Sequence, residues 1–74
     1  EEAWENREIA AVIDRWLDGL EREDRVIFLR RYWYGQRVDE LAALWSCTPN
    51  RMAQRLFRLR GGLRRALEEE GVSL

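Results

Sequence analysis

The sequence predicts an all-α fold, a compact four-helix domain. Apolar residues recur at spacings of three and four along most of the chain, the period of helices that bury one face. One Pro and five Gly leave little material for the turns of a β-rich fold, and 46% hydrophobic residues indicate a globular chain rather than a disordered one. At 74 residues the chain forms a single domain, residues 1–74, with one modest core.

The first predicted helix spans about residues 5–18. Its apolar stripe is Ile9, Ile13, Trp16, Leu17 and Leu20. Gly19 stands where a C-terminal cap is expected. The second helix spans about residues 23–33, because Glu23 and Asp24 favour a helix N-terminus and Gly35 follows its end. Val26, Leu29 and Trp33 lie on one face of it, widened by Ile27 and Phe28. A buried strand over residues 26–29 is the alternative, which the flanking charges disfavour.

Residues 38–60 have the pattern of a helix-turn-helix. A short helix over about residues 38–45 buries Leu41, Leu44 and Trp45, and Ala42 is small where two helices must approach closely. Residues 46–48 form the turn, in which Ser46 stands where many such motifs place Gly.

The fourth helix is predicted over about residues 49–68, because Thr48 is a good N-cap and Pro49 suits the first helical position. Its stripe is the most regular in the chain, and its members are Met52, Leu56, Leu59, Leu63 and Leu67. Gly61 and Gly62 interrupt the helix at roughly 1 kcal/mol each relative to Ala, enough for a kink or an early end.

The tryptophans on these stripes are predicted to belong to the core, namely Trp16, Trp33 and Trp45, whereas Trp4 precedes the first stripe. Cys47 occupies a turn position that favours a small apolar residue, so we expect burial rather than redox chemistry. A lone Cys excludes an internal disulfide, and the absence of His makes a zinc site implausible.

Charge is distributed unevenly, although the net charge is only −1. Residues 1–24 contain nine acids, whereas residues 51–65 contain six Arg and no acid. This asymmetry predicts a phosphate-facing end and an acidic end that faces away from DNA or toward another partner. All thirteen basic residues are Arg, which suits bidentate contacts to phosphate and guanine, although a GC-rich genome gives the same bias.

The outer face of the fourth helix carries the functional prediction. With its stripe turned inward, the exposed side presents amide and guanidinium side chains together with Ala53, and these are Asn50, Arg51, Gln54, Arg55 and Arg58. Asn, Gln and Arg are the side chains that read base edges bidentately in the major groove. The helix N-terminus adds free N–H groups for a phosphate. This pattern predicts binding to double-stranded DNA.

Other functions are disfavoured. The chain has no His, no paired carboxylates in an evident cleft and no Gly-rich phosphate loop, so we expect neither enzymatic activity nor a cofactor. Without a recognisable signal peptide or an apolar run long enough to span a membrane, we expect a cytoplasmic protein. The chain opens on Glu1 rather than Met, as a fragment of a longer protein would.

The run from Leu20 to Leu67 resembles region four of bacterial sigma factors, most closely the extracytoplasmic-function type. The resemblance rests on the order and spacing of several short motifs: Leu20, Arg25-Val26-Ile27-Phe28-Leu29, Arg31-Tyr32, Gly35, Val38-Asp39-Glu40-Leu41-Ala42, the Ser46-Cys47-Thr48 turn, Met52, Arg55-Leu56 and Arg58-Leu59-Arg60. It covers about two-thirds of the chain.

The resemblance implies a domain that binds the promoter element near minus thirty-five and docks on RNA polymerase. The promoter-facing residues would be Pro49, Asn50, Arg51, Gln54, Arg55 and Arg58, with Arg37 on backbone phosphate. The first two helices would receive the flap-tip helix of the polymerase β subunit, and the acidic end would meet polymerase or an inhibitory anti-sigma protein. Ala53 departs from the Lys often found there, and Gly61-Gly62 departs from good helix formers.

Two other functions are compatible with the same pattern. One is a response-regulator-type helix-turn-helix output domain, a class that usually dimerises through its last helix. The other is a protein-interaction module that retains the fold without DNA binding, which the acidic net charge and Ala53 would suit.

Overall fold

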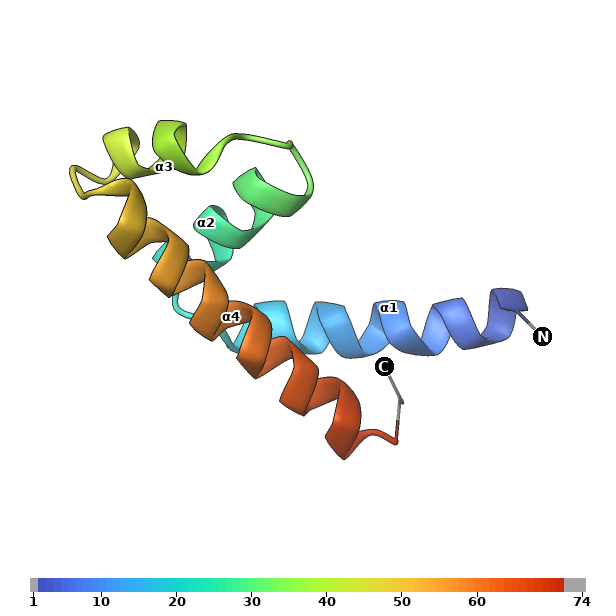
Figure 1. Ribbon diagram of the computed structural model, residues 1–74. Helices are drawn as coiled ribbons and strands as arrows, with labels where there is room; N and C mark the ends of the chain where they lie inside the picture. The colour runs from blue at the N-terminus through green and yellow to red at the C-terminus, as the bar shows by residue number, and fades with distance from the viewer. Residues whose placement is uncertain (1, 72–74) are drawn as a thin grey trace.

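Four helices in the predicted order make up the protein, as a computed structural model of residues 2–71 shows, with side chains described from residue 7 (Figure 1). They are α1 (Glu2–Gly19), α2 (Arg22–Tyr32), α3 (Val38–Leu44) and α4 (Pro49–Glu69). No strand occurs between residues 2 and 71, so the all-α prediction is confirmed. The side chain of Trp4 lies outside the described residues. None of the described helices combines the length and the apolar character needed to cross a bilayer.

Helix α4 organises the domain, because it packs against each of the other three helices. Its N-terminal half lies against α2 and α3 (Figure 1), while its C-terminal half contacts α1, to which it is joined by the Arg15–Glu70 ion pair at 2.9 Å. The Gly61-Gly62 pair does not end α4, which continues to Glu69. Gly62 faces α1, since a Cβ at this position would lie 3.4 Å from the indole Nε1 of Trp16, the close limit of ordinary van der Waals contact.

The core lies where α2, α3 and α4 meet. Each helix contributes buried apolar side chains, which are Ile27 and Phe28 from α2, Leu41 and Ala42 from α3, and Met52, Leu56 and Leu59 from α4. Trp16 of α1 packs against this cluster and meets the ring of Phe28 edge-on at 4.9 Å between centroids. Removing this apolar surface from water is the main stabilising contribution to such a fold.

Arg25 joins α1 to α2. Its guanidinium donates hydrogen bonds to the carbonyl oxygens of Leu17 and Leu20, at 3.1 and 3.3 Å. Leu17 lies in the last turn of α1 and Leu20 directly follows the helix, a region where several carbonyls lack the intrahelical partners of a helix interior. The α1–α2 corner is therefore held by a side chain as well as by the chain connection.

Two of the predicted core residues are not in the core. Trp33 is 78% exposed, because α2 turns Ile27 and Phe28 inward and ends at Tyr32, one residue before it. Leu44 is 57% exposed, since the inner face of α3 follows positions 38, 41, 42 and 45 rather than 44. Trp16, Trp45 and Cys47 are partly buried against the core, in agreement with the prediction.

Candidate nucleic-acid interface

The turn between α3 and α4 is a tight helix C-cap in which Ser46 adopts a left-handed conformation, with φ of 53°. The N–H of Cys47 donates to the carbonyl of Ala42 at 2.9 Å, and the N–H of Ser46 donates to that of Ala43 at 3.2 Å. This pair of bonds is the Schellman arrangement, in which Gly usually holds the position that Ser46 occupies here. The turn therefore satisfies the last carbonyls of α3 at the cost of local strain in Ser46.

Helix α4 begins immediately after this turn. The Thr48 hydroxyl accepts the N–H of Arg51 at 3.1 Å, and Pro49 is the first helical residue. Pro49 has no N–H to satisfy, so Thr48 and Pro49 together leave fewer open donors at the start of α4 than an uncapped helix has. Pro49 and Asn50 are both exposed, which leaves the N-terminal end of α4 open to solvent.

Four of the predicted DNA-facing side chains share the exposed side of α4. Asn50, Arg51, Gln54 and Arg58 are all exposed, and no side-chain hydrogen bond or ion pair engages them among the described residues. Ala53 lies exposed beside Gln54. The two guanidiniums thus have no compensating carboxylate within the described fold. Such a surface offers amide and guanidinium donors to an anionic or hydrogen-bonding partner.

Arg55 is directed away from that set. Its Nε lies 2.8 Å from Oδ1 of Asp24 and its Nη1 lies 3.1 Å from Oε1 of Glu23, both in the first turn of α2. Its side chain is only 28% exposed. Burial by itself would lower the pKa of Arg55, but the hydrogen bonds and negative charges of Asp24 and Glu23 raise it above the ordinary value. In this arrangement Arg55 fastens α4 to α2.

Arg37 lies at the opposite end of α3 from the turn. Its side chain is 73% exposed and its Nε lies 3.2 Å from Oδ1 of Asp39. Its backbone N–H donates to the Glu40 carboxylate at 2.9 Å, which completes one half of a capping box. The structure therefore gives Arg37 a local acidic partner and separates it by the length of α3 from the exposed face of α4.

One exposed residue of α4 was missed in the sequence. Phe57 is 69% exposed and lies beside Arg60, whose guanidinium carbon is 5.9 Å from the ring centroid. The sequence did indicate this exposure, because Phe57 falls outside the apolar stripe of α4, where a large aromatic side chain cannot reach the core. Glu23 and Asp24 were interpreted only as a helix start, although they also pair with Arg55.

Within the described part of the chain, no three or more His, Cys, Asp or Glu side chains lie together in a way that could hold a metal ion. Comparison with known proteins assigns no family, because no protein-family model, no curated protein and no solved structure matches the chain.

Proposed function

We propose that this chain is a sequence-specific DNA-binding domain whose α3–α4 unit acts as a helix-turn-helix. The observation that carries the proposal is the set of four exposed, uncompensated side chains on α4, namely Asn50, Arg51, Gln54 and Arg58. An α-helix of this kind fits the major groove, where amide and guanidinium groups distinguish base pairs by their hydrogen-bonding edges.

The exposed residues divide into two roles in this proposal. Asn50, Arg51 and Gln54 lie in the first two turns of α4 and read base edges, because recognition helices approach the bases with their N-terminal residues. Arg58 lies one turn further on and contacts backbone phosphate. Arg55 is a positioning residue, because its guanidinium is committed to Asp24 and Glu23.

The finer proposal follows the resemblance to region four of sigma factors. The target is then the promoter element near minus thirty-five, and the chain works in the cytoplasm together with RNA polymerase. A surface on α2 suits the polymerase β flap: Val26 and Leu29 are only partly buried, and with Arg30, Tyr34 and Gln36 they line an open pocket. The charge asymmetry supports the same orientation, with the acidic α1 away from the duplex.

The test is a selection of bound sequences from a randomised duplex library, followed by titration of the selected duplex at several salt concentrations. We expect affinity to fall steeply as salt rises, because phosphate contacts release counterions. Gln54→Ala should cost about 1–3 kcal/mol on the selected duplex and relax the preference at one base pair. Arg58→Ala should weaken binding to all duplexes alike and reduce the salt slope by about one.

Arg7→Ala is the matched control, since Arg7 is an exposed arginine of α1 with no side-chain ion pair among the described residues. It should leave the selected preference and the affinity nearly unchanged. No duplex binding at low salt, with or without core RNA polymerase, would favour the protein-interaction module. Dimeric binding to paired half-sites would favour the response-regulator class.

A further inference from the structure

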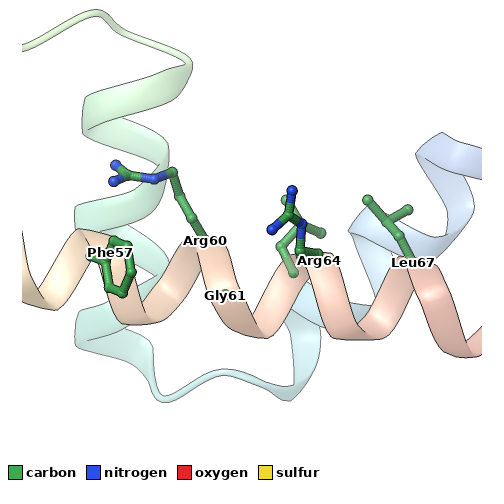
Figure 2. A pocket seen from close by; sticks show the side chains of 6 residues that line it. Phe57, Arg60, Gly61, Arg64 and Leu67 are labelled. Carbon is green, nitrogen blue, oxygen red and sulfur yellow. The ribbon is translucent and has the colours of Figure 1, made fainter. Parts of the chain in front are cut away.

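An apolar groove runs along one flank of α4, beyond the face proposed to bind DNA. It encloses about 440 Å³ and is lined by Phe57, Arg60, Gly61, Leu63, Arg64 and Leu67. Figure 2 shows the labelled members of this set following one another along the helix. From Phe57 to Leu67 the helix rises about 15 Å, which matches a partner helix of roughly ten residues laid beside it.

The groove is separate from the proposed reading face. At 100° per residue, its members centre roughly a third of a turn around α4 from Gln54 and Arg58, and they extend up to three turns further along. Phe57 and Gly61 border both surfaces, because they lie three residues after Gln54 and Arg58, respectively. An occupant of the groove therefore need not displace DNA, and the groove's role does not depend on whether α4 binds DNA.

Glycine opens the middle of the groove. A Cβ placed at Gly61 would meet nothing within 4 Å, so this stretch of α4 presents bare backbone between Phe57 and the leucines. Phe57 is 69% exposed and covered by no other described element. A helix can approach closely over a glycine while its apolar side chains contact Phe57 on one side and the partly exposed Leu63 on the other.

The charges of the groove are all positive. Arg60 donates a 2.5 Å hydrogen bond to the hydroxyl of Tyr32 and lies over the Phe57 ring, and both of these partners are neutral. Arg64 has only a 4.0 Å contact with Glu68, and both side chains are more than half exposed. No carboxylate lines the groove. The groove thus carries one guanidinium without a carboxylate partner, that of Arg60, and one with only a long, exposed ion pair, that of Arg64.

We propose that this groove is a docking site for an acidic amphipathic helix of another protein. Apolar side chains of that helix would cover Phe57 and the exposed part of Leu63 while its carboxylates pair with Arg60 and Arg64, combining burial of apolar area with charge complementarity. A second copy docked groove to groove would place Arg60 and Arg64 against their own copies, which like-charge repulsion opposes. Duplex DNA would match the arginines but leave the apolar floor uncovered.

The probe is a synthetic capped helical peptide of about fifteen residues, with Leu at every third or fourth position and Glu elsewhere on the flanks of that stripe. The full chain, labelled with ¹⁵N, is titrated with this peptide and with a matched peptide that has Lys in place of Glu. We expect amide shifts to change around Phe57, Gly61 and Arg64 with the acidic peptide, and about tenfold weaker binding of the basic one.

Two pairs of variants locate the site. Arg60→Glu together with Arg64→Glu should weaken the acidic peptide at least tenfold, whereas Arg65→Glu, an exposed arginine of α4 outside the groove, should change affinity less than twofold. Gly61→Leu should fill the groove and abolish binding without unfolding the chain, since its Cβ has open space. Gly61→Ala is its control and should retain binding.

Several results would overturn the proposal. Equal binding of the acidic and basic peptides would remove the charge argument, and shift changes confined to Val26, Leu29 and Tyr34 would place the site on α2 instead. Self-association of the free chain that Gly61→Leu abolishes would make a second copy the occupant. DNA binding is measured separately on the same variants, so failure of the groove and failure of the proposed DNA interface remain distinguishable.

Discussion

Removal of the contact between Arg55 and Asp24 tests how α4 is held in place. The two side chains lie 31 positions apart in the chain, on α4 and α2, and their charged atoms are 2.8 Å apart. We consider a double-mutant cycle of Arg55→Ala, Asp24→Ala and the combined variant. The cycle cancels effects that each replacement has alone, such as losing an acid from the first turn of α2, and leaves the coupling between the two groups.

The magnitude follows from burial. A hydrogen bond between charged groups contributes about 1.5–3 kcal/mol when well protected, whereas an exposed ion pair contributes about 0.2–1 kcal/mol. Arg55 and Asp24 are 28% and 25% exposed, between those two cases. We therefore expect a coupling of about 1–2 kcal/mol, and a smaller one with Glu23, which is 54% exposed.

The assay is urea unfolding followed by tryptophan fluorescence, with the free energy extrapolated to water for each variant. The pair Arg15–Glu70 is the matched control: its charged atoms lie 2.9 Å apart, but the side chains are 62% and 52% exposed. We expect a coupling of about half a kcal/mol or less there. If the effects of Arg55→Ala and Asp24→Ala on the free energy of unfolding simply added in the double variant, the coupling would be zero. That result would refute the argument, because it would mean that each side chain interacts with its partner no more favourably than with water.

The same variants separate two roles for Arg55. If Arg55 positions α4, Arg55→Ala and Asp24→Ala should lower the affinity for all duplexes by a similar factor and preserve the base preference. A loss of preference at one base pair in Arg55→Ala, absent from Asp24→Ala, would instead identify Arg55 as a reading residue.

Three further predictions concern the fold. Ser46→Gly should raise the free energy of unfolding by about 0.5–1 kcal/mol, since Gly relieves the left-handed strain at φ 53° but also adds freedom to the unfolded chain. The control Ser46→Ala should give no gain, and a lower free energy of unfolding in Ser46→Gly would contradict the assignment of strain to Ser46. Gly61→Ala should stabilise the chain by about 0.5–1 kcal/mol through helix propensity, and Gly62→Ala by less, because its Cβ would lie 3.4 Å from Trp16. Thermal unfolding compares the two variants, and equal gains would mean that Trp16 does not crowd position 62. Trp33→Ser should change the free energy of unfolding by less than about 0.5 kcal/mol, because Trp33 is 78% exposed. Ile27→Ala should lower it by about 2–5 kcal/mol, because Ile27 is fully buried. A loss at Trp33 as large as that at Ile27 in urea unfolding would place Trp33 in the core.

Local patterns in the sequence were enough to predict the helices of this protein. The stripe Met52, Leu56 and Leu59 identified the buried side of α4, and all three residues are buried. The Thr48-Pro49 pair predicted the start of α4, and Pro49 is its first residue. These features depend on residues within one or two turns of each other, so the chemistry of a short segment decides them before any tertiary contact forms.

Tertiary structure decided which side chains on the outer face of α4 have no partner within the described fold. Arg55 has the same side chain as Arg51 and Arg58, and only the crossing of α4 over the first turn of α2 places it against Asp24. Trp33 falls outside the core for a related reason, since the direction in which α2 turns its inner face depends on where α3 and α4 lie. Periodicity groups residues on the faces of a helix, but neighbouring helices determine which faces are covered. The sequence by itself therefore determined the helices and their caps, whereas helix packing decided the role of Arg55 and opened the groove beside Phe57.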